Sequence, residues 1–301
     1  MAASTPRRTL TVIGAPTSAG SYAAGQEQAP RVLREYGLQQ RLRARGREVV
    51  DAGDGPLQVW GADREHPLAQ NLEQAADAIR VAGTMVGAAL DGGSDVLLLG
   101  GNCTVALGAM SALVARDVAS ALVYVDRHFD LNTPETTIDG ALDWMGVAAA
   151  LGLLPDAPDF GFPRSPLLTP QQLRYVGVDP EAATEWERGQ VRRMGIQWGS
   201  NDALAADPEA EIAAALEWVG GRPFALHLDL DVLDFTDLPL AENTDGRNSG
   251  PTLAAISTVL SAGCAADGCR VLSIGELNPT RAAGTPDAVP RFVDALVAAL
   301  G

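Results

Sequence analysis

The feature that most constrains the fold is a regular alternation of short apolar, β-branched runs with longer amphipathic stretches. Seven runs have the composition of strands, and several are apolar throughout, as strands buried on both faces of a parallel sheet are. The stretches between them have the length and periodicity of helices. The predicted strands are 9–13, 48–51, 95–99, 121–125, 173–178, 224–230 and 271–274, and the predicted helices are 29–45, 68–90, 105–115, 183–194, 209–219, 253–262 and 291–300.

This alternation predicts an α/β fold, in which a mostly parallel, doubly wound sheet carries helices on both faces. No repeat or low-complexity linker divides the chain, so we expect one domain over residues 1–301. In such sheets the functional site lies at the carboxyl ends of the strands. Polar residues that directly follow an apolar run are therefore the candidates for chemistry.

The charged residues exclude several classes of function. The chain has 22 basic and 38 acidic side chains and a formal charge of −16, and it contains no lysine. Schiff-base, pyridoxal-phosphate and P-loop chemistry each need a lysine amine, so all three are excluded. The acidic excess argues against nucleic acid and anionic membranes as partners.

The same sequence predicts a cytoplasmic protein. No apolar run reaches the roughly 20 residues of a membrane span, and the first residues lack a signal-peptide core. Cys103, Cys264 and Cys269 are too few and too unevenly placed for a disulfide framework. Cys264 and Cys269 flank a short turn before the last predicted strand, where we do not expect a metal site.

Two strand ends carry clusters of carboxylates. Asp126, His128 and Asp130 follow one apolar run, and Asp229 and Asp231 end another. Because side chains alternate along a strand, each set can project to one side. Buried carboxylates need cations, and here the candidates are arginine or metal. Oxygen-rich ligation with one imidazole suits Mn²⁺, and a shared carboxylate suits two metal ions about 3.5 to 4 Å apart.

Two further strand ends complete the pattern. A double-glycine turn, Gly100-Gly101-Asn102-Cys103, follows one strand, and Glu276 ends the last one. With these, the chain resembles the ureohydrolase superfamily of arginase, agmatinase and formiminoglutamase. Residues 126–130 resemble the family's Asp-Ala-His-x-Asp motif, and the other matching segments, in the family's order, are 13–16 with 29–34, 228–234 and 276–279.

The resemblance implies a three-layer α/β/α fold with a sheet of roughly eight strands and two Mn²⁺ ions that share a hydroxide. Asp126 and Asp229 would bridge the ions. His128 and Asp231 would complete one site, and Asp130 would belong to the other. The hydroxide would attack a guanidinium carbon, which releases urea and an amine.

The resemblance also implies roles in substrate binding. Glu276 would pair with the substrate guanidinium, and Asn132 matches a position that helps to bind the amino-acid part in arginases. Asp130 would hold the nucleophile and pass a proton to the leaving group. The expected substrate is a small guanidino compound. Because members of the family commonly form oligomers, we expect a homo-oligomer.

Cys103 is the first departure from the family pattern, because a histidine ligand of the first metal ion usually stands there. That site would consist of Cys103 with Asp126, Asp130 and Asp229. A thiolate is softer than imidazole and favours Zn²⁺ or Fe²⁺ over Mn²⁺. The sequence therefore leaves three alternatives: weak Mn²⁺ binding, another metal, or an empty site. His227 is expected to play a core or supporting role.

Asp143 is the second departure, since arginases carry a histidine proton shuttle at this spacing. An aspartate cannot shuttle protons near neutrality without a large pKa shift, so it would instead bind a cationic part of the substrate. The favoured function is hydrolysis of a guanidino or amidino compound of the arginase, agmatinase or N-hydroxyguanidine type. The alternatives are a catalytically impaired binding or regulatory protein and a single-metal, deacetylase-like hydrolase that uses Asp126, His128 and Asp229.

Overall fold

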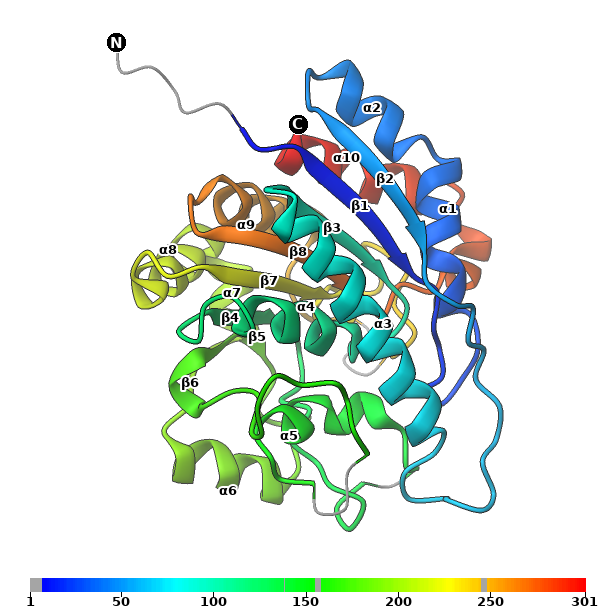
Figure 1. The fold of residues 1–301 in the computed structure, drawn as a ribbon, viewed down its shortest axis with the longest axis vertical. Coiled ribbons are helices and arrows are strands. Elements are labelled where there is room, and N and C mark those ends of the chain that lie inside the picture. The colour runs from blue at the N-terminus through cyan, green and yellow to red at the C-terminus, as the bar shows by residue number, and fades with distance from the viewer. Residues whose placement is uncertain (1–6, 138, 155–157, 245–247) are drawn as a thin grey trace.

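A computed structural model describes residues 7–137, 139–154, 158–244 and 248–301. Within these residues eight strands form one sheet, and every pair of neighbouring strands is parallel. The strand order is β2-β1-β3-β8-β7-β4-β5-β6 (Figure 1). The strands are β1 Leu10–Ala15, β2 Val49–Asp54, β3 Asp95–Gly100, β4 Ala121–Val125, β5 Leu173–Val178, β6 Gln197–Ser200, β7 Phe224–Asp229 and β8 Cys269–Gly275.

Helices cover both faces of the sheet and enclose two apolar cores. Along β3, Leu97 and Leu99 face one core, whereas Val96 and Leu98 face the other. The first core includes side chains of α1, α2 and α7–α10, and the second includes those of α3–α6. The predicted three-layer α/β/α fold is therefore confirmed. The helices are α1 Ala29–Glu35, α2 Leu38–Ala44, α3 Leu72–Asp91, α4 Val105–Val114, α5 Gly146–Ala150, α6 Glu185–Met194, α7 Asn201–Ala206, α8 Pro208–Val219, α9 Leu253–Ala265 and α10 Ala288–Leu300.

The short helices α5 and α7 were not predicted, and the structure departs from the sequence-based expectation in two further places. The stretch expected as one helix over 29–45 is two helices, because Gly37 between them adopts a left-handed conformation with φ 78°. Strand β6 was not predicted, since Gln197–Ser200 is a short edge strand with mostly exposed or half-buried side chains and no apolar run. Both differences lie away from the strands that carry the predicted motifs.

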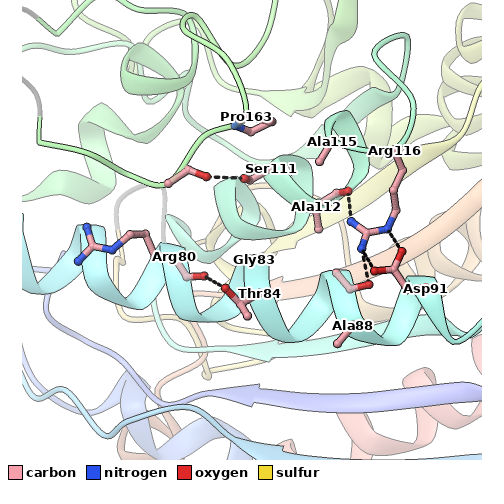
Figure 2. Close-up of a pocket in the computed structure, with 12 residues that line it drawn as sticks. Arg80, Gly83, Thr84, Ala88, Asp91, Ser111, Ala112, Ala115, Arg116 and Pro163 are labelled. Carbon is pink, nitrogen blue, oxygen red and sulfur yellow. Dashed lines mark hydrogen bonds and ion pairs between the residues drawn. The ribbon is translucent and has the colours of Figure 1, made fainter.

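Helices α3 and α4 lie side by side across one face of the sheet (Figure 1). Glycine allows this close approach, because a Cβ on Gly108 would lie 2.8 Å from the carbonyl oxygen of Ile79. A groove runs along their outer surface (Figure 2). In it Arg116 donates to Asp91 and to the carbonyl of Ala112, so this cation is already paired. No helix of the described residues is long and apolar enough to cross a membrane.

Candidate active site

Four neighbouring strands, β3, β8, β7 and β4, end at one cavity. Cys103 follows β3, Glu276 follows β8, and Asp229 ends β7. Because consecutive parallel strands finish at the same edge, residues more than 170 positions apart meet there. The residues that line the cavity are Tyr22, Cys103, His128, Asp130, Asp143, Trp144, Asp229, Asp231, Asn243 and Glu276.

Asp126, His128 and Asp231 form a compact, buried cluster. Their potential ligand atoms all lie within 4.8 Å of one another. The backbone N–H of His128 donates to Asp126 Oδ1 at 2.7 Å, which fixes the turn after β4. His128 Nδ1 lies 3.0 Å from Asp231 Oδ2 and 3.6 Å from Asp126 Oδ1. Asp126 lies outside the cavity lining, but it contributes to this cluster from the side of the turn.

Asp130 and Asp229 line the same cavity as His128 and Asp231. Asp130 has a left-handed backbone with φ 52°, and its Oδ2 accepts a hydrogen bond from the hydroxyl of Tyr124 at 2.7 Å. Asp229 Oδ1 accepts from the backbone N–H of Asp231 at 2.9 Å. Each carboxylate is thus held by one local hydrogen bond, and both also line the cavity.

Glu276 is fixed from both sides. Its backbone is left-handed, with φ 61°, and its N–H donates to the carbonyl of Gly101 at 2.9 Å. The N–H of Cys103 donates to Glu276 Oε1 at 2.8 Å, and the Nε2 group of Gln26 donates to Oε2. The double-glycine turn permits this arrangement, since a Cβ on Gly101 would lie 1.6 Å from the carbonyl oxygen of Thr17.

Cys103 lies with Asp143 and Glu276, and the ligand atoms of these three buried residues are within 4.8 Å of one another. The thiol donates to the carbonyl of Asp143 at 3.5 Å. Burial raises the pKa of the Cys103 thiol well above its ordinary value, and the nearby charges of Asp130 and Asp143 add to that rise. The thiol therefore keeps its proton unless a cation replaces it. The compact group around Cys103 contains Asp143 and Glu276, which the resemblance did not assign to a metal.

The electrostatics of the cavity favour bound cations. Burial, followed by neighbouring carboxylates, raises the pKa of Asp130 and Asp229 well above the usual range. Burial and the charge of Asp231 raise the pKa of Asp126 to about 6. Burial also opposes ionisation of Asp231, but the charge of His128 outweighs it and lowers the pKa of that carboxyl. Neighbouring buried carboxylates resist being ionised at the same time. A multivalent cation stabilises their ionised forms.

The donor set fits divalent metal ions. Asp231 Oδ1 is buried without a hydrogen-bond partner among the described residues, although the opposite oxygen is paired with His128. Oxygen ligands with one imidazole suit Mn²⁺, and a thiol beside further carboxylates suits a softer ion such as Zn²⁺ or Fe²⁺. The residues that would bind the metal ions lie in two clusters at the strand ends. They include Cys103, Asp126, His128, Asp130, Asp229 and Asp231.

The carboxyl of Asp143 resists ionisation in the fold. Burial raises the pKa of its carboxyl to about 8, although a hydrogen bond from Asn102 opposes that rise. Its side chain lies 6% exposed and lines the cavity. Asp143 therefore lies beside Glu276 in the lining of the cavity.

Asn132 lies outside the cavity lining. Its Oδ1 accepts hydrogen bonds from the hydroxyls of Thr136 and Thr184, each at 3.0 Å. Its backbone N–H donates to the carbonyl of Trp144 at 2.9 Å. In this arrangement Asn132 joins the loop after β4 to the start of α6.

Several neighbours of the site carry no signal in the sequence. Tyr22 and Trp144 line the cavity, and Gln26 contacts Glu276. Tyr22 and Gln26 belong to a loop between β1 and α1 rather than to a strand end, so strand-end reasoning does not find them. His227 is fully buried, stacks on Tyr124 with ring centroids 4.7 Å apart, and pairs with Ser273 at 2.8 Å.

Comparisons with known proteins agree with this geometry. The sequence pattern of the arginase family matches residues 8–296. The chain belongs to the arginase family. Human arginase-1 is 30% identical over 306 residues, which cover 97% of this chain and 91% of the human protein. This arginase-family chain also has the fold of arginase from Bacillus caldovelox, with a TM-score of 0.85 and 23% identity over 97% and 98% of the two chains.

The fold is shared more widely in the superfamily. Formiminoglutamase from Trypanosoma cruzi, whose structure was solved with Mn²⁺, superimposes with a TM-score of 0.72 and 15% identity over 99% of this chain and 95% of that one. At that identity the likeness establishes the fold alone. Membership of the arginase family rests on the match over residues 8–296, while the substrate has to be argued from the site.

Proposed function

We propose that this protein hydrolyses a C–N bond of a guanidino or amidino compound and releases an amine, together with urea or a substituted urea from a guanidine, or an amide from an amidine. The observation that supports this proposal is that Glu276 lines the same cavity as His128 and Asp231, two members of the cluster that they form with Asp126. A carboxylate fixed by two donors can receive a planar cation beside a cluster suited to metal ions. The substrate classes considered are those of arginase, agmatinase and N-hydroxyguanidine hydrolysis.

Two groups of residues would hold metal ions. Asp126, His128 and Asp231 would hold one, with Mn²⁺ as the preferred ion, and Cys103 would contribute to a second, softer site. Asp229 and Asp130, which lie beside both groups in the cavity, would supply further oxygen ligands. A bound divalent ion lowers the pKa of water towards neutrality and so supplies the nucleophile.

The chain's own residues orient the substrate and move protons. Glu276 would pair with the guanidinium, and the N–H of Cys103 and the amide of Gln26 keep its carboxylate in place. Asp143, whose ligand atom lies within 4.8 Å of those of Glu276 and Cys103, would accept a second hydrogen bond from the same planar cation.

Asp130 would hold the proton that the leaving amine requires. Its carboxyl is buried and raised in pKa, and the Tyr124 hydroxyl fixes its orientation. Both properties suit a group that takes up and returns a proton during a reaction. Asn132 is proposed to act only indirectly in substrate binding, through the loop that it anchors.

The test is turnover by protein with a measured metal content. Chain loaded with Mn²⁺, and separately with Mn²⁺ plus Zn²⁺, would be incubated with arginine, agmatine, formiminoglutamate and N-hydroxyguanidines. We expect equimolar amounts of an amine and of urea or a substituted urea, or of formamide in the case of formiminoglutamate, from at least one of them. Glu276→Gln should reduce kcat/KM at least about 100-fold, because it removes a charge-assisted pair, whereas the exposed Glu185→Gln should not change it.

Two outcomes would contradict the proposal. Absence of turnover across the panel by protein that holds two metal ions would favour a binding or regulatory protein. Hydrolysis of acetylated amines by protein with one Zn²⁺ would favour the deacetylase-like alternative.

A further inference from the structure

Arg127 is a buried arginine beside the candidate metal cluster. It lies between Asp126 and His128 in the sequence, where the family's Asp-Ala-His-x-Asp motif has alanine. The residue is only 1% exposed, and its side chain is the largest of the fully buried ones among the described residues. A guanidinium keeps its charge in proteins and is costly to bury without partners. The partners of Arg127 therefore indicate why this chain has an arginine there.

The side chain of Arg127 makes hydrogen bonds with three separate segments. Its Nε–H donates to the backbone carbonyl of Asp231 at 3.1 Å, in the turn after β7. One terminal nitrogen donates to the carbonyl of Ser249 at 2.6 Å. The other donates to the hydroxyl of Ser249 at 3.1 Å and to Asp179 Oδ2 at 3.3 Å. Arg127 thus joins the segments that follow β4, β5 and β7 to the segment before α9.

Asp231 is the member of the metal cluster that Arg127 contacts directly. The N–H of Asp231 donates to Asp229 Oδ1 at 2.9 Å, and its carbonyl accepts from Arg127. Because the peptide groups on both sides of Asp231 are held, the direction of its side chain is held as well. That side chain places Oδ2 3.0 Å from His128 Nδ1, and its Oδ1 is buried without a hydrogen-bond partner among the described residues. Arg127 therefore helps to set the orientation in which Asp231 can bind a cation.

The segment before α9 fits closely around the guanidinium. Gly250 has φ 113°, in the region that favours glycine. A Cβ at this position would lie 2.9 Å from a terminal nitrogen of Arg127 and 2.6 Å from the carbonyl oxygen of Val232. A smaller side chain at position 127 would leave the carbonyls of Asp231 and Ser249 without this donor, and a buried carbonyl that loses its donor is destabilising.

We propose that Arg127 is a positioning residue for the Asp126–His128–Asp231 cluster, and that it holds Asp231 in the orientation that binds a divalent metal ion. Arg127 is joined to all three members, because it is bonded covalently to Asp126 and His128 and hydrogen-bonded to Asp231. The proposal rests on the metal cluster of the proposed function but not on the identity of the substrate. Removal of a residue that orients a metal ligand typically weakens metal binding about 10- to 100-fold.

The test compares the wild-type chain with Arg127→Ala, which introduces the alanine of the family motif. Mn²⁺ binding is measured by equilibrium dialysis, with free Mn²⁺ detected by electron paramagnetic resonance. The free energy of unfolding of each protein is measured with urea in the presence of a chelator. We expect the tighter-bound Mn²⁺ to bind about tenfold or more weakly to Arg127→Ala. Unchanged Mn²⁺ affinity in the folded variant would overturn the proposal.

Arg222→Ala is the matched control, because Arg222 also donates to backbone carbonyls but lies before the amino end of β7. Its acceptors are the carbonyls of Gln171, Trp218 and Val219. This variant should lose stability, because its acceptors lose a donor, and should keep its Mn²⁺ affinity. Equal losses of Mn²⁺ affinity in Arg127→Ala and Arg222→Ala would assign the effect to general destabilisation and would overturn the proposal.

Arg127→Lys separates the hydrogen bonds of Arg127 from its charge. Lysine retains the positive charge but lacks the rigid planar fork that reaches Asp231 and Ser249 together. We expect the Mn²⁺ affinity of Arg127→Lys to lie within about threefold of that of Arg127→Ala. Wild-type affinity in Arg127→Lys would assign the effect to charge and would contradict a positioning role.

A second measurement uses only the wild-type chain. Amide hydrogen exchange is followed by mass spectrometry with and without saturating Mn²⁺. Exchange should slow about threefold or more in peptides that contain Asp231 and also in peptides that contain Ser249, because Arg127 links the two segments. Protection confined to the peptides that contain Asp231 would contradict that link.

The same measurements distinguish this proposal from the proposed hydrolysis. A wild-type chain that binds no Mn²⁺ would overturn both the positioning role of Arg127 and the proposed metal cluster. A wild-type chain that binds Mn²⁺ more tightly than Arg127→Ala but turns over no guanidino or amidino compound would support the positioning role and contradict the hydrolysis.

Discussion

The two ends of the sheet differ in how their charged side chains are balanced. At the amino end, Asp95 is surrounded by Arg8, Arg47 and Arg270, with nitrogen–oxygen distances of 3.5, 3.8 and 2.8 Å. At the carboxyl end, the described residues place six buried carboxyl groups around one histidine, and these are Asp126, Asp130, Asp143, Asp229, Asp231 and Glu276. Charge that is paired internally stabilises the fold, whereas charge left in excess in a buried cavity marks the place for a cation.

The largest effect is expected at Asp229, where one substitution should weaken metal binding and stabilise the metal-free protein. Asp229→Asn should weaken metal binding at least about 100-fold, because a charged ligand is lost. The pKa of Asp229 is raised in the fold, so the metal-free protein loses stability as pH rises from the unfolded pKa to the folded one. Asparagine avoids that loss and should stabilise the metal-free protein at neutral pH by about 1 kcal/mol.

Metal binding is measured by metal analysis after gel filtration. The stability of the metal-free protein is measured by urea unfolding in the presence of a chelator. The control is Asp234→Asn, since Asp234 caps a local turn through Thr236 rather than lining the cavity. Parallel losses of metal affinity and of metal-free stability would assign Asp229 a structural role instead.

A change of metal preference is expected at Cys103. Cys103→His should raise affinity for a second Mn²⁺ about tenfold or more, because imidazole is a harder ligand than a thiolate. The same change should weaken binding of Zn²⁺ relative to Mn²⁺. Competitive titration with both ions measures the ratio, and an unchanged ratio would remove Cys103 from the metal site.

An intermediate effect is expected at Gln26, which we assign as a positioning residue for Glu276. Gln26→Leu removes the donor to Glu276 Oε2, and loss of such a bond to a charged group costs about 1.5 to 3 kcal/mol. KM for the guanidino substrate should rise about tenfold or more while kcat changes less. The exposed Gln40→Leu is the control, and equal losses of kcat by both variants would contradict the assignment.

The smallest effect is expected at the amino end. Asp95→Asn should lower the free energy of unfolding by about 1 to 2 kcal/mol, because three partly exposed ion pairs are weakened together. The difference should shrink in 1 M salt. Metal content should stay unchanged, and a loss of metal here would show that the two ends of the sheet are not independent.

Local geometry accounts for part of the candidate site. Period-two alternation places Asp126 and His128 beyond β4, and the parallel sheet then brings β7 beside β4, so Asp231 reaches His128. The sequence therefore identifies the polar residues at each strand end separately. The pairing of their side chains depends on strand order, which alternation alone does not specify.

Other contacts depend on tertiary structure and leave no local pattern. Gln26 reaches Glu276 across 250 positions of sequence. The grouping of Cys103 with Asp143 comes from a loop that folds back over the turn after β3. Strand β6 is stabilised by pairing with β5 rather than by its own apolar residues, which is why its sequence gave no strand signal.

The left-handed backbones of Asp130 and Glu276 have a consequence for the evolution of this chain. Among the described residues only Asn71, Asp130 and Glu276 have positive φ without being glycine, and two of these three line the cavity. An L-residue in this conformation costs about 1 kcal/mol relative to glycine. Glycine at both positions would remove this conformational cost and stabilise the fold. The two acids therefore indicate that some stability has been given up in exchange for the chemistry of their side chains.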